Sequence, residues 1–163
     1  MFAGFTKTGN VDEDERLFLD ALSLMMIEED GSFYKRIANL SNIASSINDF
    51  MGCLNWAGFY LYDGDKLVLG PFQGEPACSE IMIGRGVCGT AAAAMETQIV
   101  DDVLKFPGHI ACSSSSKSEL VVPIIKGQSL YGVIDLDSPA VARFSSHDAL
   151  FIEKIASLVS SLT

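Results

Sequence analysis

Hydrophobic residues recur at helical spacing in two stretches near the N-terminus. Asp12 and Glu15 form a capping-box pattern ahead of the first stretch, and the tripeptide DGS at positions 30–32 ends it. The predicted inward face of this first helix consists of Leu17, Ala21, Leu24 and Met25. The second stretch predicts a helix over residues 32–49. Its predicted inward face consists of Ile37, Leu40, Ile43, Ala44 and Ile47.

The pattern then changes to the two-residue period of strands. In "NWAGFYLYD" one face carries Trp56, Gly58 and Tyr60, and the other carries Ala57, Phe59 and Leu61. The turn "DGDK" and the strand "LVLG" complete a hairpin, and "ELVVPII" and "LYGVIDLDS" form a second hairpin around "KGQ". Shorter strands are expected at "SEIMI" and "QIV", with a glycine- and alanine-rich helix between them. Ser145 and Asp148 cap a final helix that extends to Leu162.

This order of elements predicts the fold class. Two helices precede a run of hairpin-linked strands that contains one inserted helix, and a last helix follows. Since no strand–helix–strand alternation is sustained, we expect an α+β fold in which helices pack on an antiparallel sheet. The absence of an internal repeat or linker predicts a single domain over residues 1–163.

Composition narrows the classes of partner. The formal net charge is −10 and the pI is about 4.4, which argues against nucleic acid and anionic membranes as partners. The N-terminus lacks the pattern of a signal peptide, and no apolar run is long enough to span a bilayer. We therefore expect a cytoplasmic protein, whose four cysteines are mostly reduced. With only two histidines and no CxxC pair, neither a metal nor a bound cofactor is predicted.

The cysteines are the candidate nucleophiles. Cys112 lies in the long irregular stretch 101–118, after His109, where a reactive thiol and an incidental loop cysteine are equally consistent with the pattern. Cys88, in "GRGVCGT", is expected at a helix N-terminus that favours the thiolate, although close packing alone explains this cysteine better. Cys78 follows a loop rich in proline and glycine and should be accessible. Cys53 borders apolar residues and is predicted to be a buried structural thiol.

Acidic and aromatic residues suggest a pocket. Asp135 and Asp137 are two apart on a predicted strand, so they share a face, and two carboxylates this close raise at least one pKa. Such a pair can donate a proton or hold an ammonium group, but it can also form the solvated face of an edge strand. Glu119 opens the adjacent strand. Trp56 and Tyr60 share one face of another strand and are either a pocket wall or ordinary core aromatics.

Five segments together resemble one family. The sequence contains, in order, "NWAGFYLY", "LVLGPFQGEPAC", "GRGVCGTAAA", "FPGHIACSSSSKSELVVP" and "GVIDLDSP". This set resembles the GAF-domain free methionine-(R)-sulfoxide reductases along essentially the whole chain. The resemblance implies a GAF fold, with the N- and C-terminal helices on one face of a central antiparallel sheet and a ligand pocket on the other. It also implies reduction of free L-methionine-(R)-sulfoxide.

The resemblance further implies roles for individual residues. Cys112 would attack the substrate sulfur, Cys78 would form a disulfide with it, and Cys88 would be a further cysteine for resolution or exchange with thioredoxin. The pocket acids would be Glu119, Asp135 and Asp137, and the aromatic wall would be Trp56 and Tyr60. A homodimer is typical of GAF domains. The main alternative is a GAF module that senses small molecules or redox state without catalysis.

Overall fold

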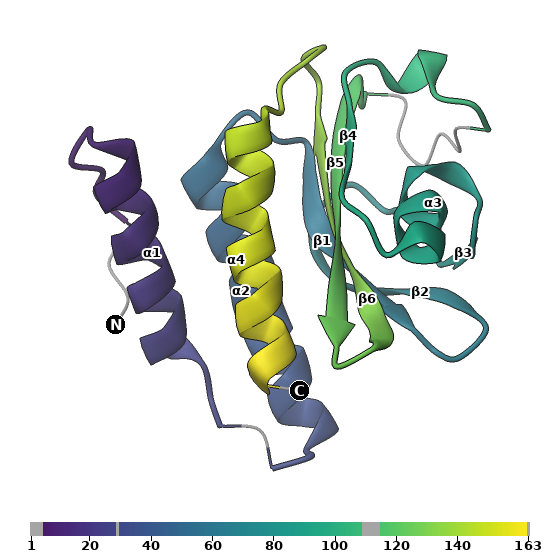
Figure 1. Cartoon of the computed structure of the whole chain (residues 1–163). Coiled ribbons are helices and arrows are strands. Elements are labelled where there is room, and N and C mark those ends of the chain that lie inside the picture. Colours follow the sequence, from purple (N-terminus) through teal and green to yellow (C-terminus); the bar gives the residue numbers. More distant parts are fainter. Residues whose placement is uncertain (1–4, 29, 109–114, 163) are drawn as a thin grey trace.

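The computed structural model describes residues 5–28, 30–108 and 115–162 of the 163-residue chain. Its helices in these ranges are α1 (Val11–Met25), α2 (Phe33–Met51), α3 (Gly86–Ala94), α4 (Ser146–Leu162) and the short 3-10 helix η1 (Val103–Lys105). Its strands are β1 (Trp56–Tyr62), β2 (Lys66–Gly74), β3 (Glu80–Met82), β4 (Gln98–Val100), β5 (Ser118–Lys126) and β6 (Ser129–Ser138). The order along the chain is the predicted one (Figure 1).

The strands form one six-stranded sheet in the order β3-β2-β1-β6-β5-β4. Every neighbouring pair is antiparallel, so the predicted α+β class with an antiparallel sheet is confirmed. Strand β6 lies between β1 and β5 and pairs with both along most of its length. The interpretation of Asp135 and Asp137 as the solvated face of an edge strand is therefore wrong.

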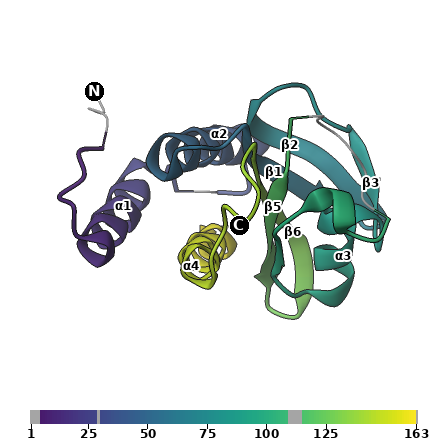
Figure 2. The same ribbon diagram turned by 90° about the horizontal axis from the view of Figure 1, so that it is seen from above.

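Helices α1, α2 and α4 lie on one side of the sheet, with α1 in the outermost position (Figures 1 and 2). The apolar face of α2 is the predicted one, since Leu40, Ile43, Ala44 and Ile47 are buried in the core between these helices and the sheet. They meet Ala57 and Phe59 of β1 there. Ile37 is half-buried.

The predicted inward face of α1 is wrong. Ala21 and Leu24 are exposed, Phe18 and Leu22 are buried in the core, and of the predicted residues Met25 packs partly buried against that core. The helix begins one residue before Asp12, with Asn10 as its N-cap. The inward face also contains two buried acids, Asp14 and Glu15, which hydrophobic periodicity does not predict. Asp14 accepts hydrogen bonds from the backbone N–H and the hydroxyl of Thr8. Glu15 pairs with His147 of α4 at 2.8 Å.

None of the described helices combines the length and the apolar character that a membrane span requires.

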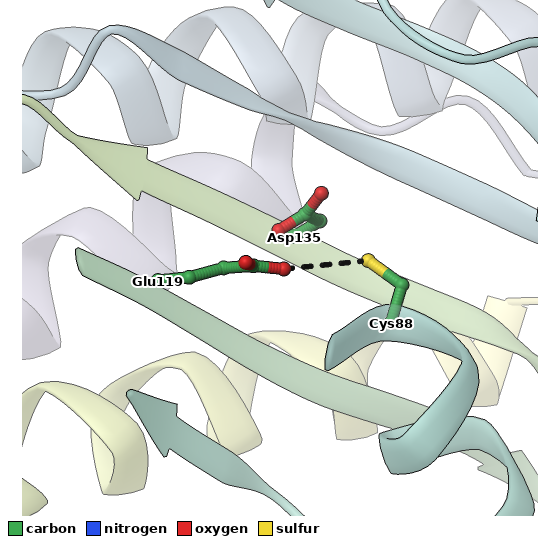
Figure 3. A group of neighbouring side chains, drawn as sticks. All are labelled: Cys88, Glu119 and Asp135. Atoms are coloured by element: carbon green, nitrogen blue, oxygen red, sulfur yellow. Dashed lines mark hydrogen bonds between the residues drawn. The ribbon is translucent and has the colours of Figure 1, made fainter. Parts of the chain in front are cut away.

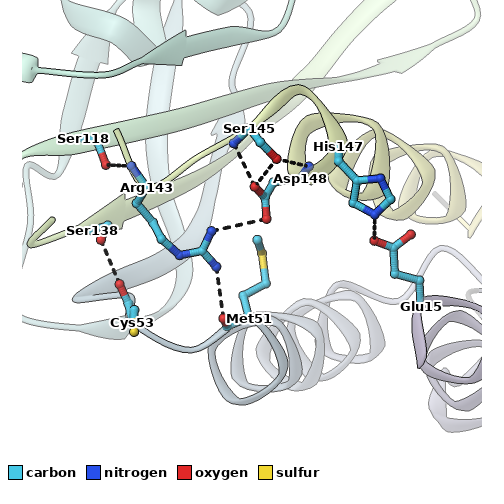
Figure 4. A network of polar contacts seen from close by, with 9 residues as sticks. All are labelled: Glu15, Met51, Cys53, Ser118, Ser138, Arg143, Ser145, His147 and Asp148. Atoms are coloured by element: carbon cyan, nitrogen blue, oxygen red, sulfur yellow. Dashed lines mark hydrogen bonds and ion pairs between the residues drawn. The ribbon is translucent and has the colours of Figure 1, made fainter. Parts of the chain in front are cut away.

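A polar network joins the start of α4 to the ends of α2, β5 and β6 (Figure 4). The predicted cap is present: the Ser145 backbone N–H donates to Asp148 at 2.8 Å, and the Asp148 N–H donates to the Ser145 hydroxyl at 3.2 Å. Arg143 donates to the Met51 carbonyl at 3.1 Å. The Arg143 backbone N–H donates to the Ser118 hydroxyl at 3.3 Å, and the Ser138 hydroxyl donates to the Cys53 carbonyl at 2.8 Å, so the network reaches the start of β5 and the end of β6.

Helix α3 packs on the opposite side of the sheet (Figure 2). A second apolar cluster lies between them and includes Trp56, Tyr60, Val87, Ala91 and Val121. The sheet therefore separates two cores, one beneath the long helices and one beneath α3.

Candidate active site

Strand pairing brings the three predicted acids together on the α3 side of the sheet. Asp137 of β6 lies opposite Trp56 of β1 and opposite Glu119 of β5, so these three residues form one row across the sheet. In the next row on the same face, Asp135 lies between Gly58 and Val121. The sheet thus holds the carboxyl groups on central strands rather than on loops, which keeps them in a fixed arrangement.

Helix α3 adds a thiol to these acids. Cys88 Sγ lies 3.8 Å from Glu119 Oε1, and Asp135 lies beside this contact (Figure 3). One donor atom from each of Cys88, Glu119 and Asp135 lies within 4.8 Å of the others. We call these three buried residues the acid–thiol cluster. Asp135 Oδ1 is buried and has no hydrogen-bond partner in the described part of the chain.

A glycine allows α3 to approach the sheet edge this closely. A Cβ on Gly89 would lie 2.4 Å from the carbonyl oxygen of Met82, at the end of β3. Because that atom belongs to the backbone, a side chain at this position would force the whole first turn of α3 to move. Gly89 therefore sets the position of Cys88, its neighbour in the same turn.

Burial dominates the electrostatics of the site. Burial raises the pKa of Glu119 well above its usual range, and the adjacent Asp135 carboxyl adds to that shift. The pKa of Asp135 is also raised well above its usual range, first by burial and then by Asp137. Burial raises the pKa of Asp137 to about 6, against a hydrogen bond from Ser116. These shifts all favour the protonated carboxyl, and the spacing of the two aspartates predicted a raised pKa for at least one of them.

Of the two interpretations of Cys88, the structure supports close packing, which the sequence favoured, over a stabilised thiolate. Although Cys88 lies in the first turn of α3, burial raises the pKa of its thiol, and the neighbouring Asp135 and Glu119 raise it further. Desolvation and two acids outweigh the helix dipole, which is worth only about 0.3–1 kcal/mol at exposed helix ends. Cys88 is a buried thiol that donates a hydrogen bond to Glu119.

An aromatic stack forms one wall beside the acids. The Trp56 ring stacks between Tyr60, with 5.8 Å between ring centroids, and Phe72 of β2, at 5.3 Å. Trp56 and Tyr60 are 2% and 1% exposed. The Tyr60 hydroxyl donates to the Cys78 carbonyl at 3.0 Å, which ties the wall to the segment that carries this cysteine.

The sequence analysis missed two contributors to the site. Phe72 pairs with Gly58 across the β1–β2 hairpin, and the missing side chain of Gly58 leaves room for the Trp56–Phe72 stack. The pairing of residues across the predicted β1–β2 hairpin could have indicated this contact. Asn55 donates to the Ser115 and Ser116 hydroxyls at 3.0 and 2.9 Å, but no local pattern marks a contact between residues sixty positions apart.

The described cysteines differ in burial and in bonding state. Cys88 is buried and free, and Cys78 is half-buried and disulfide-bonded. The predicted burial of Cys53 is wrong: this free cysteine is exposed. It lies in the turn after α2 with a φ of 56°, and its carbonyl accepts a hydrogen bond from Ser138, so its apolar sequence neighbours do not enclose it. Cys112 and His109 lie outside the described residues.

Sequence comparisons relate this chain to known proteins. The GAF domain family matches residues 36–161. Free methionine-R-sulfoxide reductase of Saccharomyces cerevisiae is 50% identical over 133 residues, which cover 76% of this chain and 73% of the yeast protein. The protein of the same name from Escherichia coli is 47% identical over 112 residues, covering 69% of this chain and 68% of its own length.

Solved structures show the same similarity. The free methionine-R-sulfoxide reductase of Neisseria meningitidis, solved in complex with its substrate, superposes with a TM-score of 0.88 at 39% identity. The match covers 99% of this chain and 95% of the other. The reduced form of fRMsr from Staphylococcus aureus superposes with a TM-score of 0.83 at 44% identity, covering 91% of this chain and 94% of that protein.

Proposed function

This chain belongs to the GAF-domain family and, within it, to the free methionine-R-sulfoxide reductases, which are oxidoreductases, and from this premise we propose that it reduces free L-methionine-(R)-sulfoxide to L-methionine. The observation that carries the proposal is the convergence of Glu119, Asp135 and Asp137 beside the Trp56–Tyr60 stack. The acids suit the ammonium group of a small amino-acid substrate, and the aromatic wall suits its apolar end.

The acids serve two purposes in this proposal. An ionised carboxylate binds the substrate ammonium group, and a protonated carboxyl donates to the sulfoxide oxygen. The raised pKa values of Glu119 and Asp135 favour the second role, since a carboxyl that is neutral at pH 7 is a hydrogen-bond donor. Trp56 encloses the methyl group. A peptide bond would remove the ammonium charge, which explains selection of the free amino acid.

Cys112 is the proposed nucleophile. Its thiolate attacks the substrate sulfur while the sulfoxide oxygen accepts a proton from the pocket acids. The bonds from the substrate sulfur to Cys112 and to the protonated oxygen then break as the hydroxyl group passes to Cys112, so methionine leaves with its sulfur reduced by two electrons and Cys112 is oxidised to a sulfenic acid. The thiol of a second cysteine then condenses with the sulfenic acid, which forms a disulfide and releases water. The scheme needs no metal or bound cofactor.

We assign the resolving role to Cys78 and the disulfide to the Cys78–Cys112 pair. The disulfide-bonded state of Cys78 supports this choice. Cys88 is the alternative resolving or exchange thiol, but its burial and raised pKa make it the slower one. Thioredoxin is the proposed reductant, since its dithiol returns the disulfide to two thiols by exchange. A cytoplasmic location and a homodimer complete the proposal.

Turnover tests the proposed function. The reduced chain is incubated with the separate R and S epimers of methionine sulfoxide and dithiothreitol, and free methionine is quantified by chromatography. We expect consumption of the R epimer alone, and no consumption of N-acetylated substrate. Cys112→Ser should abolish turnover, whereas Cys53→Ser, at an exposed position, should retain it.

Two outcomes contradict the proposal. Binding of the R epimer without production of methionine would favour a sensing GAF module instead. Persistent turnover in Cys112→Ser would remove this residue as the nucleophile. Peptide mapping of the oxidised enzyme distinguishes a Cys78–Cys112 disulfide from a Cys88–Cys112 disulfide.

A further inference from the structure

We propose that the acid–thiol cluster of Cys88, Glu119 and Asp135 is also a binding site for a divalent cation of the zinc class. The site is defined by the positions of its donor atoms and does not depend on the catalytic role of the chain. Its effect on turnover does rest on the proposed function, because the same carboxyls are proposed to bind substrate.

The donor atoms have the spacing that such an ion requires. Zn–S and Zn–O bonds of about 2.3 and 2.0 Å at a tetrahedral angle place sulfur and oxygen about 3.5 Å apart. Cys88 Sγ and Glu119 Oε1 are 3.8 Å apart, and the donor atoms of all three residues lie within 4.8 Å of one another. Small side-chain rotations therefore complete the coordination, without movement of the strands.

The chemistry of the donors favours zinc over magnesium or calcium. A thiolate is a soft ligand that suits zinc and its spectroscopic substitute cobalt, whereas magnesium and calcium take oxygen ligands. One thiolate and two carboxylates carry three negative charges, so their complex with a divalent cation has a net charge of −1. Asp137 is half-buried opposite Glu119, but it is not among the residues whose donor atoms lie within 4.8 Å of one another.

An unpartnered buried atom supports the site independently. Asp135 is 6% exposed, and its Oδ1 has no hydrogen-bond partner in the described part of the chain. Burying a polar atom without a partner costs about 1–3 kcal/mol. The Asp135 carboxyl lies beside the Cys88–Glu119 contact, so an ion bound there would also satisfy Asp135 (Figure 3). Strands β5 and β6 and helix α3 hold the three ligands on rigid elements.

A cation bound at this cluster should compete with the substrate. A cation coordinated by Glu119 and Asp135 occupies the carboxyls that would otherwise bind the substrate ammonium and sulfoxide groups. It also engages Cys88 as a thiolate. We therefore expect zinc to raise the apparent KM for methionine sulfoxide and to leave kcat unchanged at saturating substrate.

Cobalt titration of the oxidised protein tests the site directly. In this form Cys78 is held in its disulfide, so it cannot serve as a ligand. We expect one equivalent of Co²⁺ to produce a thiolate-to-cobalt charge-transfer band, which one equivalent of Zn²⁺ removes. Cys88→Ala should abolish the band, and the matched variant Cys53→Ala should retain it. Asp135→Asn should weaken binding by at least about 10–100-fold, the loss that removal of an outer-shell partner already causes.

Two results of the titration would overturn the proposal. A band that disappears in Cys53→Ala and persists in Cys88→Ala would assign the ion to the exposed thiol. Absence of binding to the wild-type chain would remove the site. If Cys88→Ala fails to fold, Asp135→Asn, which keeps both thiols, decides the question. The band is read in a form that cannot turn over, so its presence or absence is independent of whether the chain proves to be a reductase.

Discussion

Asp137 lies between Trp56 and Glu119 in one row of the sheet, and burial raises the pKa of its carboxyl from 3.8 to about 6. Between these values the folded chain retains a proton that the unfolded chain has lost. The free energy of unfolding therefore falls as pH rises from about 4 to about 6, and the loss persists at higher pH. Burial of the Asp137 carboxyl thus lowers the stability of the fold at neutral pH.

Asp137→Asn should reverse this loss. We expect the variant to exceed the wild type in unfolding free energy by up to about 3 kcal/mol above pH 6, and to match it near pH 4. Thermal and urea unfolding across this range measure the difference, with Asp65→Asn in the exposed β1–β2 turn as the control. The activity of Asp137→Asn should fall, since an amide cannot carry the negative charge that binds an ammonium group. A stability gain that is constant with pH would contradict the assignment.

Two free cysteines should differ sharply in reactivity. Cys53 is exposed, whereas Cys88 is 3% exposed and has a raised thiol pKa, so little thiolate is available to an alkylating reagent. We expect iodoacetamide to modify Cys53 at least about 100-fold faster than Cys88 in the native protein. Peptide mapping of timed samples measures both rates, and denatured protein provides the control in which they converge. Similar rates in the native protein would contradict the buried position of Cys88.

Local pattern predicted the acids better than the thiols. The two-residue spacing of Asp135 and Asp137 fixes their common face, because side chains alternate along any strand. The pKa of Cys88 instead depends on burial and on Asp135 and Glu119, which lie on strands distant in the sequence. Exposure of Cys53 follows from its position in a turn, although its sequence neighbours are apolar.

At the scale of elements, α4 provides a test of helix capping. The reciprocal hydrogen bonds of Ser145 and Asp148 satisfy backbone donors at its first turn. Ser145→Ala should lower the free energy of unfolding by about 1 kcal/mol, because one such donor loses its partner. Urea unfolding measures this change, with Ser161→Ala near the exposed end of α4 as the control. Unchanged kcat and KM are expected, since α4 lies on the opposite side of the sheet from α3 (Figure 2), and the acids lie on the α3 side.

Helices α1 and α2 show when hydrophobic periodicity predicts a buried face. The inward side of α2 is almost uniformly apolar, so four of its predicted residues are buried in the core. The inward side of α1 combines Phe18 and Leu22 with Asp14 and Glu15, whose hydrogen bonds come from other segments. The partners of a buried acid are not visible in its own helix, and the exposed Leu24 strengthened the wrong pattern.

At the scale of the whole molecule, the sheet separates a structural core from the candidate active site. The Phe18 ring of α1 lies 4.4 Å from the Phe50 ring of α2 and 5.6 Å from the Phe151 ring of α4, measured between ring centroids. Trp56 lies in the other core with Tyr60 and Phe72. Substitutions in the two cores should therefore affect different properties.

Phe18→Leu and Trp56→Phe form a matched pair for this test. We expect Phe18→Leu to lower the free energy of unfolding by about 1–2 kcal/mol with little change in kcat/KM. Trp56→Phe should lower kcat/KM by about tenfold, because part of the wall around the substrate methyl group is lost. Urea unfolding and steady-state kinetics on both variants measure these effects. A large loss of kcat/KM in Phe18→Leu would show that the two cores are coupled.

Strand β6 carries both cores on alternate residues: Ile134 and Leu136 face the long helices, while Asp135 and Asp137 face α3. If β6 paired one residue out of register during folding, every side chain would change sides. Two carboxyls would then enter the dry helical core, and two aliphatic side chains would enter the acidic site. Such a mispaired sheet is far too costly to persist. The alternation of aliphatic and acidic residues along β6 therefore also disfavours a shifted strand register during folding.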